Sequence, residues 1–487
     1  MPINNGQPNS NHKHIALAKA TKLIVVGIDF GTSTTKVMYR SAVDFNPPVH
    51  LVNFAHGHPK FPSFVMPSSI RLDSEYRFWF GDIAEAGYGK VFRSFKVCAA
   101  CQVNAIDCRG CHQNNLEKDP PLGRFKDDLI GFITAHELMI YYLAWLLDIV
   151  NGVITYDQRN AVEPELQYNL GVPVSHLATK PDLVDRFEWI LHISLKLRGK
   201  IQQGISAAEA RSHLIEVLPA SPLPPPAERN HRVLPETAAA AMWLQKTAAD
   251  EEITNYMLID IGAGTTDITV YRYAQINSHI LPIYGANSVS VAADNIDFTT
   301  IQWFANQCGK KIGTLPQLSS ALLQEMRCIK EALPRPNKPI EAVLGGRIFS
   351  LDEQTYIKEI VIPHAEAIYK TANETFREAY QLARRESHWQ KIKIVLLGGG
   401  SRIVGIDRYF SDNHLRHFMK QQFTKPQIPD DVVMKNLNDF QLLAVAYGLA
   451  FPSAEFPDVQ PPNRIQPLPL EKPKHESEYN ENALLSN

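Results

Sequence analysis

Two segments of the sequence carry the same arrangement of residue types, and that arrangement could bind phosphate through a metal ion. They are VVGIDFGTSTTKV (25–37) and MLIDIGAGTTDITV (257–270). Each has an apolar stretch, an aspartate, a turn rich in Gly and Thr, and a second apolar stretch, so that Asp29 corresponds to Asp260. The two aspartates are 231 residues apart. This spacing is too large for a solenoid repeat and favours two similar lobes that face each other.

The residue types in these turns suit anion binding. Glycines allow close approach of the backbone, successive backbone N–H groups form an anion-binding concavity, and Thr and Ser add hydroxyl donors. We expect the turns to hold phosphates with Gly31, Thr32, Ser33, Thr34, Gly262, Ala263 and Gly264. Because an aspartate repels phosphate, Asp29 and Asp260 are expected to hold a hydrated Mg²⁺, which prefers oxygen ligands and keeps several waters. Asp267 and Thr265 are expected to orient the attacking water or the phosphate. The alternative is a pair of purely structural β-hairpins.

A third segment, IVLLGGGSRIVGI (394–406), combines an apolar strand with three glycines, Gly398, Gly399 and Gly400. Bare backbone of this kind admits a flat ligand, and the guanidinium plane of Arg402 could stack on a purine. We expect these residues to line a nucleoside pocket. The alternative is a simple turn between a strand and a helix.

A fourth segment, LPETAAAA (234–241), places Glu236 at the start of an Ala-rich helix. An acidic residue there stabilises the N-terminus of a helix. Beside a metal–phosphate site it would instead order the waters of Mg²⁺, and this is the role that we expect for Glu236.

These motifs resemble those of a known superfamily and occur in its order. GIDFGTSTTK (27–36) and DIGAGTTD (260–267) resemble the two phosphate loops of the actin, sugar-kinase and heat-shock protein 70 superfamily. LLGGGSRI (396–403) is similar to the adenosine motif of the heat-shock protein 70 branch, and LPETAAAA to its Glu-Pro-Thr-Ala-Ala-Ala segment. The resemblance implies an α/β protein with a two-lobed actin-like ATPase fold of duplicated ribonuclease-H-like domains. It also implies ATP or ADP, with Mg²⁺, in a cleft between the lobes.

Two lysines of the expected site come from the same resemblance. FGDIAEAGYGKVFRSFKV (80–97) is similar to a segment of relatives that lack a peptide-binding domain, which makes Lys96 the expected stabiliser of charge on the γ-phosphate. The alternative for Lys96 is a solvated surface lysine. Lys330, in QEMRCIKEAL (324–333), matches the lysine of the family helix that lines the adenosine pocket. No segment resembles the β-sandwich domain of the true chaperones, so we expect no peptide clamping by that route.

Four cysteines form two Cys-x-x-Cys pairs in KVCAACQVNAIDCRGCHQN (96–114). They are Cys98, Cys101, Cys108 and Cys111. Paired knuckles of this kind in a chain without a secretory signal predict a structural zinc site of four thiolates. An iron–sulfur centre or a redox pair is the alternative.

The amino-acid composition argues against several classes of protein. Hydrophobic residues make up 45% and charged residues 21% of the chain, which is typical of globular proteins. The net charge of -2 gives no overall basic field for nucleic acid. The most apolar stretch, 138–147, is short for a bilayer span, and residues 1–22 lack the apolar run of a secretory signal. We therefore expect a cytoplasmic protein without a membrane partner.

Short apolar runs alternate with helical patterns, which predicts an α/β architecture. The predicted strands are 23–28, 168–172, 257–261, 268–273 and 392–397, and the predicted helices are 134–150, 182–197, 237–246, 317–333 and 359–382. The expected organisation is a disordered tail (1–21), a first lobe (22–250) with an inserted subdomain (41–125), a second lobe (251–436) with an inserted subdomain (291–354), a helix returning to the first lobe (437–452) and a disordered Pro-rich tail (453–487).

The expected function is an ATP-hydrolysing switch that acts on an unknown protein partner, as the resemblance to the heat-shock protein 70 branch implies. Two other functions fit the same motifs: a filament-forming ATPase of the actin type, and a small-molecule kinase of the same superfamily.

Overall fold

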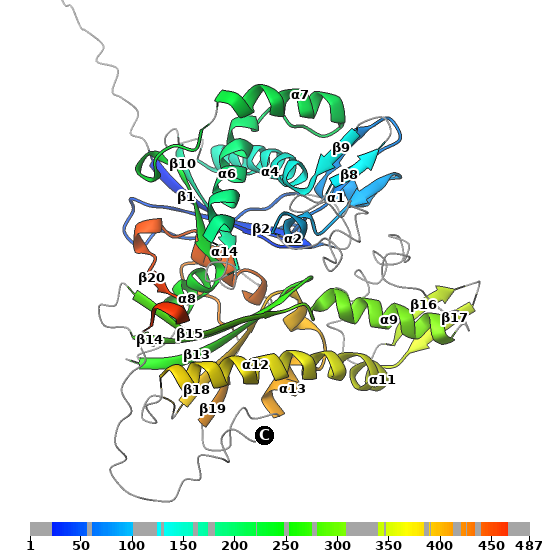
Figure 1. Cartoon of the computed structure of the whole chain (residues 1–487), viewed down its shortest axis with the longest axis vertical. Coiled ribbons are helices and arrows are strands. Elements are labelled where there is room, and N and C mark those ends of the chain that lie inside the picture. The colour runs from blue at the N-terminus through cyan, green and yellow to red at the C-terminus, as the bar shows by residue number, and fades with distance from the viewer. Residues whose placement is uncertain are drawn as a thin grey trace, which may run out of the picture.

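Two large mixed sheets form the centre of this α/β protein (Figure 1). The computed structural model describes residues 22–55, 61–100, 124–127, 131–158, 164–173, 181–220, 222–247, 253–274, 280–307, 339–344, 347–383, 389, 391–412, 420–424, 426–433 and 440–465. The first sheet has the order β12-β10-β1-β2-β3, with β4 paired to β2. Its strands are β1 (Lys22–Phe30), β2 (Thr34–Ser41), β3 (His50–Leu51), β4 (Met66–Pro67), β10 (Pro164–Val172) and β12 (His231–Pro235).

The second sheet has the order β19-β18-β13-β14-β15-β20. Its strands are β13 (Ile253–Ile261), β14 (Thr266–Ala274), β15 (Ile280–Val289), β18 (Lys391–Leu397), β19 (Lys420–Thr424) and β20 (Asp458–Gln460). All five strands predicted from the sequence are confirmed, with ends that differ by a few residues.

The two sheets share one topology. In the first, β1, β2 and β3 pair antiparallel in succession, while β1 pairs parallel with β10 and β10 parallel with β12. In the second, β13, β14 and β15 pair antiparallel in succession, while β13 pairs parallel with β18 and β18 parallel with β19. The short repeat visible in the sequence is therefore the first hairpin of each sheet, and the repeat extends to five strands.

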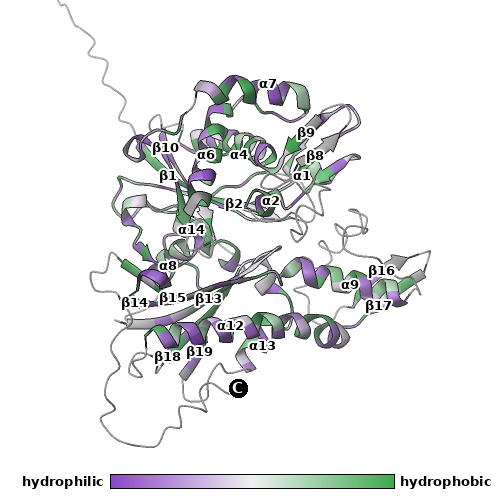
Figure 2. Ribbon diagram, viewed as in Figure 1, coloured by the Kyte–Doolittle hydropathy of each residue, from purple (hydrophilic) through white to green (hydrophobic). Residues whose placement is uncertain are grey.

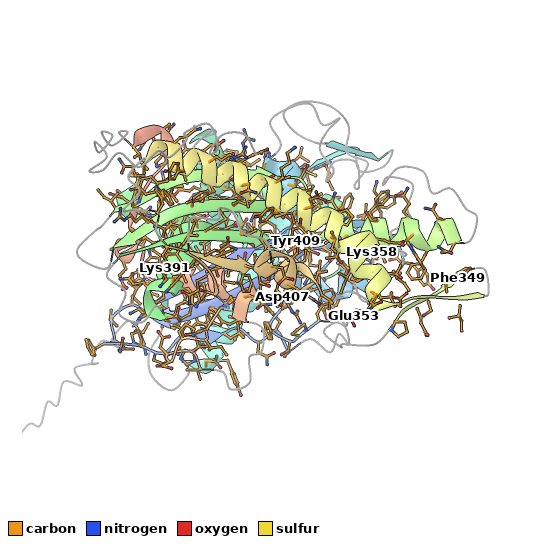
Figure 3. The ribbon with its side chains drawn as sticks, turned by 90° about the horizontal axis from the view of Figure 1, so that it is seen from below. Phe349, Glu353, Lys358, Lys391, Asp407 and Tyr409 are labelled. Carbon is orange, nitrogen blue, oxygen red and sulfur yellow. The ribbon has the colours of Figure 1, made fainter. Side chains whose placement is uncertain are left out.

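Helices separate and cover the sheets. The helices α4 (Ala135–Asp157) and α6 (Pro181–Leu197) share a hydrophobic core with the first sheet, and hydrophobic residues line β1, β10 and α4 (Figure 2). The helices α8 (Glu236–Thr247) and α14 (Ala444–Leu449) lie between the two sheets and share a core with both. The long helix α12 (Ile362–Leu382) crosses the outer face of the second sheet (Figure 3). Four of the predicted helices are thus confirmed, and 317–333 lies outside the described residues.

The remaining helices and strands lie outside these two sheets. The other helices are α1 (Gly81–Glu85), α2 (Phe95–Ala100), α7 (Ala207–Val217), α9 (Ala293–Gln307), α11 (Glu353–Thr355), a π-helical turn (Tyr356–Val361) and α13 (Ile406–Asp412). A small sheet has the order β11-β6-β5-β7, and two hairpins are formed by β8 with β9 and by β16 with β17. The bounds of these strands are β5 (Ile70–Leu72), β6 (Arg77–Phe80), β7 (Lys90–Phe92), β8 (Arg124–Asp127), β9 (Gly131–Thr134), β11 (Ile205–Ser206), β16 (Ile340–Leu344) and β17 (Arg347–Leu351).

Helix α4 is longer than its most apolar stretch. Thr134 and Glu137 form a capping box at its start, in which each side chain accepts a hydrogen bond from the other residue's backbone N–H. Its 23 residues are long and apolar enough to cross a membrane, but 67% of the most apolar 18-residue window is buried inside the protein. The helix is thus the core helix expected from the sequence, although its full length exceeds the ten residues on which that expectation rested.

Strand pairing connects the range 41–125, expected to be an inserted subdomain, to segments outside it. The insertion expected at 41–125 is not separate throughout, because β3 and β4 pair with β2 of the first sheet. The small sheet also takes one strand from outside this range, since β11 pairs with β6. Strand pairing between distant segments decides both points, and no local pattern in the sequence records it.

The tail predicted to be disordered from residue 453 is ordered as far as residue 465. Strand β20 pairs parallel with the start of β15, and Phe456 and Val459 pack against the core shared by the two sheets. A three-residue edge strand is held by backbone hydrogen bonds to its neighbour. It is too short to show an alternating apolar pattern, so it could not be predicted from the Pro-rich sequence around it.

Candidate functional site

The two aspartates of the sequence repeat occupy the same register in their hairpins. Asp29 pairs with Lys36 across β1 and β2, and Asp260 pairs with Asp267 across β13 and β14. Both aspartates lie one residue before the end of their strand. The repeat is therefore structural as well as sequential, with one exchange of charge: a lysine in the first hairpin takes the place of an aspartate in the second.

The two turns are closed in the same way. The N–H of Gly31 donates to the carbonyl of Thr34 at 3.1 Å, and the N–H of Gly262 donates to the carbonyl of Thr265 at 2.9 Å. A Cβ atom at Gly31 would lie 2.5 Å from that carbonyl oxygen, and one at Gly262 would lie 2.9 Å away. Both turns therefore require glycine at this position, because any side chain would collide with the backbone.

The two turns also meet each other. A Cβ atom at Gly264 would lie 3.3 Å from Cγ2 of Thr32 and 3.5 Å from Cγ2 of Val97. The second turn therefore lies against both the first turn and the residue that follows Lys96. The two glycine-rich turns and the segment that carries Lys96, which the sequence analysis assigned to phosphate contacts, therefore lie together in the structure.

Four carboxyl groups gather at this place. Burial, followed by the negative charges of Glu236, Asp29 and Asp267, raises the pKa of Asp260 to about 8. Burial is also the main cause that raises the pKa of Glu236, with Asp29 and Asp267 adding to it and Lys96 opposing it. Such shifts arise where like charges are held together away from water. The structure thus brings together all four acids that the sequence singled out.

Two lysines partly balance the four acids. The ammonium group of Lys96 donates to Oε1 of Glu236 at 3.0 Å and lies 5.7 Å from the ring centre of Phe30. The ammonium group of Lys36 donates to Oδ2 of Asp29 at 3.2 Å. Lys96 is only 8% exposed, so the alternative of a solvated surface lysine is wrong.

Close packing of small residues places Glu236. It is the first residue of α8, directly after β12. A Cβ atom at Gly171 would lie 2.9 Å from its Cγ atom, and one at Gly448 would lie 1.8 Å from the carbonyl oxygen of Ala239. Helix α8 therefore lies against β10 and α14 at a distance that larger side chains would prevent.

The second turn is fixed from both sides. The hydroxyl of Thr265 donates to Oδ2 of Asp267 at 3.3 Å. The carbonyls of Gly262 and Ala263 accept hydrogen bonds from the N–H groups of Ala293 and Asp294 at 3.1 and 2.9 Å, just at the start of α9. In the first turn, the carbonyl of Ser33 accepts a hydrogen bond at 2.9 Å from the N–H of the serine after β4.

The three glycines after β18 differ in their surroundings. Gly398 has a φ angle of +78°, and a Cβ atom there would lie 2.2 Å from Oδ1 of Asp260. A Cβ atom at Gly400 would lie 2.3 Å from Cγ2 of Ile261, whereas the nearest atom to Gly399 is a side-chain carbon of Leu442 at 3.8 Å. Two of these glycines thus make room for the end of β13, and the third is open.

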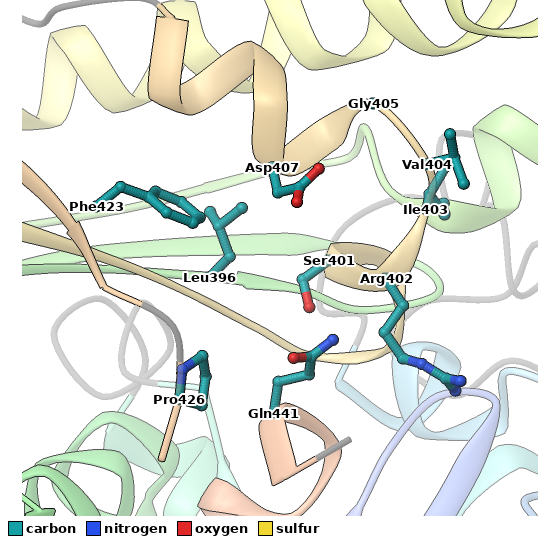
Figure 4. A pocket seen from close by; sticks show the side chains of 10 residues that line it. All are labelled: Leu396, Ser401, Arg402, Ile403, Val404, Gly405, Asp407, Phe423, Pro426 and Gln441. Carbon is teal, nitrogen blue, oxygen red and sulfur yellow. The ribbon is translucent and has the colours of Figure 1, made fainter. Parts of the chain in front are cut away.

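A cavity of about 320 Å³ opens beside this loop (Figure 4). Its lining residues come from β18, the loop after it, α13, β19 and the segment before α14: Leu396, Ser401, Arg402, Ile403, Val404, Gly405, Asp407, Phe423, Pro426 and Gln441. Arg402 lines this cavity, whereas the three glycines expected from the sequence to line a nucleoside pocket do not. Lys330, the other side chain expected there, is outside the described residues.

The predicted zinc ligands are mostly outside the described part of the chain. Cys101, Cys108 and Cys111 belong to residues whose structure is not described, and Cys98 lies in α2, 1% exposed within the core of the first sheet. Within the described residues no group of three or more His, Cys, Asp and Glu side chains has a geometry that could hold a metal ion directly.

Sequence reasoning missed Lys36. It is 7% exposed and binds Asp29, in the position that Asp267 occupies in the second hairpin. The signal was present in the aligned segments, where Lys36 is the one charged residue that breaks the match between the two copies.

No protein-family model and no curated protein matches this chain.

Proposed function

We propose that this chain binds ATP with Mg²⁺ between two actin-like lobes and hydrolyses it, as a switch of the type found in the heat-shock protein 70 family. The observation that carries the proposal is the equal register of Asp29 and Asp260 in two sheets of the same topology, together with the contact between their turns. A duplicated sheet whose two glycine-rich turns face each other is suited to hold a polyphosphate from both sides.

The charges of the site fit Mg²⁺. Four carboxyl groups face two lysines, and burial, followed by the negative charges of the other three acids, raises the pKa of Asp260. A divalent cation would supply the missing positive charge. The carboxylates do not form a direct ligand cage in the described residues. At phosphate sites Mg²⁺ usually keeps several of its waters, and we propose that these carboxylates hold it through those waters.

The residues have separate roles in the proposed reaction, an in-line attack of water on the γ-phosphoryl group. Asp29 and Asp260 hold the hydrated cation, and Glu236 accepts hydrogen bonds from its waters. Asp267 and Thr265, which are joined by a hydrogen bond, orient the attacking water. Lys96 and Lys36 place positive charge on the phosphate oxygens as negative charge develops there. The cavity beside Arg402 accommodates the nucleoside.

Binding of ATP exchanges partners at two places. In the structure Lys96 is bound to Glu236 and Lys36 to Asp29, so each lysine is held by an acid of the site. A magnesium–phosphate group offers each acid a cation and each lysine an anion. Both ion pairs lie within the first lobe, beside the contact of Gly264 with Thr32 and Val97. Nucleotide binding therefore rearranges charged groups next to the meeting point of the two turns, and a ligand that does so biases two conformations and signals to a protein partner.

The purified chain provides the test. ATP and ADP affinity should be measured with and without Mg²⁺, together with release of phosphate. We expect micromolar or tighter binding that requires Mg²⁺, and slow turnover. Binding of neither nucleotide would refute the proposal, and assembly on ATP, seen by pelleting, would favour the filament-forming alternative.

The cysteine cluster forms a second part of the proposal. We infer that Cys98, Cys101, Cys108 and Cys111 hold one structural zinc ion close in sequence to Lys96. Elemental analysis of protein purified under reducing conditions should give one zinc per chain. Iron with visible absorption would replace zinc by an iron–sulfur centre, and no metal would leave a redox pair or inert thiols.

A further inference from the structure

A pair of hydroxyl groups joins α8, which carries Glu236, to β14, which carries Asp267. Oγ1 of Thr237 and Oγ1 of Thr269 lie 3.2 Å apart, within hydrogen-bond distance. Thr237 follows Glu236 at the start of α8. Thr269 lies two residues after Asp267 in β14, and alternate residues of a strand share a face. The hydrogen bond therefore connects the backbone that carries Glu236 to the backbone that carries Asp267.

An apolar core lies on one side of this pair. In this core Ala238 and Ala240 of α8 meet Leu258 and Tyr271 of the second sheet. Thr269 is only 4% exposed, whereas Thr237 is partly buried. At such a position two apolar side chains of the same shape would serve stability as well or better, because a buried hydrogen bond contributes little net free energy. The pair therefore adds little net stability by itself.

The two acids beside the pair repel each other. Asp267 is one of the negative charges acting on Glu236, and these two residues belong to different elements, β14 and α8. Repulsion favours separation of α8 from β14. We propose that the Thr237–Thr269 hydrogen bond is a positioning contact that fixes the spacing between Glu236 and Asp267 for ATP hydrolysis. This inference rests on the proposed function.

The short distance between the two hydroxyl oxygens allows the positioning role to be tested. Two hydroxyl oxygens approach to 3.2 Å here, whereas two methyl groups meet at about 3.5–4.0 Å. Replacing both threonines by valine keeps shape and burial but widens the gap between α8 and β14. In an enzyme site a displacement of about 1 Å can lower the rate by as much as about 100-fold.

Four variants separate a positioning role from a packing role: Thr237→Val, Thr269→Val, the double valine variant and the double variant Thr237→Ser with Thr269→Ser. Each is compared with the wild-type chain by thermal melting, by binding of ATP with Mg²⁺ and by single-turnover hydrolysis. The single valine variants should melt lower, because each leaves one hydroxyl of this contact without its partner. The double valine variant should regain the melting temperature of the wild type.

The double valine variant decides the question. We expect its hydrolysis rate to stay roughly tenfold or more below the wild type, with nucleotide affinity changed less than threefold, while the double serine variant keeps the wild-type rate within about twofold. Recovery of the rate together with the melting temperature would overturn the positioning role and leave the proposed function intact. A wild-type chain without turnover would overturn the proposed function and this inference with it.

Discussion

The ammonium group of Lys96 donates a hydrogen bond to Oε1 of Glu236 at 3.0 Å and so joins α2 to α8 across 140 positions of the sequence. The side chains of both residues are largely buried, at 10% and 14% exposure. Burial raises the pKa of Glu236, and the charge of Lys96 acts against that rise. Lys96 therefore favours the ionised carboxylate, and the same charge is available for a phosphate group.

Removing this lysine should slow the reaction more than it weakens binding. Lys96→Ala should lower the hydrolysis rate by roughly 100-fold or more, because Lys96 acts on charge that develops in the transition state. Affinity for ATP with Mg²⁺ should fall less than tenfold. Lys200→Ala, which removes an exposed lysine of a surface ion pair, is the matched control. Equal losses in rate and affinity would show that Lys96 holds only ground-state phosphate.

The paired aspartates should be required for turnover. Asp29→Asn and Asp260→Asn should each reduce Mg²⁺-dependent hydrolysis below detection, whereas Asp44→Asn, at a surface ion pair, should not. Wild-type turnover in both site variants would refute the metal–phosphate site.

The same substitution at Asp260 should also stabilise the protein without nucleotide. The pKa of Asp260 is raised to about 8, so between about pH 4 and 8 the folded protein binds a proton that the unfolded chain has lost. The free energy of unfolding therefore falls as pH rises through this window. Asn cannot ionise, so the melting temperature of Asp260→Asn should exceed that of the wild type at pH 8, and this difference should shrink at pH 5.

Gly398 and Gly399, which follow β18, should differ in how well they tolerate substitution by alanine. Gly398→Ala combines a φ angle of +78° with a contact of 2.2 Å to Oδ1 of Asp260, so it should displace that carboxylate and abolish turnover. A Cβ atom at Gly399 would have its nearest neighbour at 3.8 Å, so Gly399→Ala should leave Asp260 in place and keep the rate at saturating ATP within a fewfold of the wild type, even if ATP binds less tightly. Equal hydrolysis rates in the two variants would show that the close approach of Gly398 does not set the position of the Asp260 carboxylate.

A buried histidine should make the protein sensitive to acid. Burial, with the charges of His192, Arg229 and Arg232, lowers the pKa of His231 to about 4. Below the usual histidine pKa of about 6.5 the unfolded chain binds a proton that the folded protein does not. The free energy of unfolding should therefore fall as pH drops from about 6.5 to about 4, by up to about 1.4 kcal/mol per pH unit.

His231→Phe tests this, since it keeps an aromatic ring but cannot ionise. Denaturant melts at pH 7, 6 and 5 should show a weaker loss of stability in the variant than in the wild type. A parallel pH dependence in the two proteins would show that His231 makes no contribution.

The sequence by itself determined the elements and the chemistry of the two hairpins. An apolar strand, an aspartate and a glycine-rich turn are local features, because strand burial and turn geometry depend on residues that are neighbours in the chain. For this reason Asp29 and Asp260, and the turns after them, follow from the order of residue types alone. The resemblance of the motifs supplied Lys96 and Glu236 as candidates, but not the bond between them.

Only the tertiary structure decided which residues act on one another. The hydrogen bond between Lys96 and Glu236 and the contact of Gly398 with Asp260 join segments more than 100 residues apart. The order of β20, in a tail predicted to be disordered, depends on the exposed edge of β15. The raised pKa of Asp260 needs burial and three other acids at once. Packing and electrostatic interactions depend on distance in space, and a single sequence reports only distance along the chain.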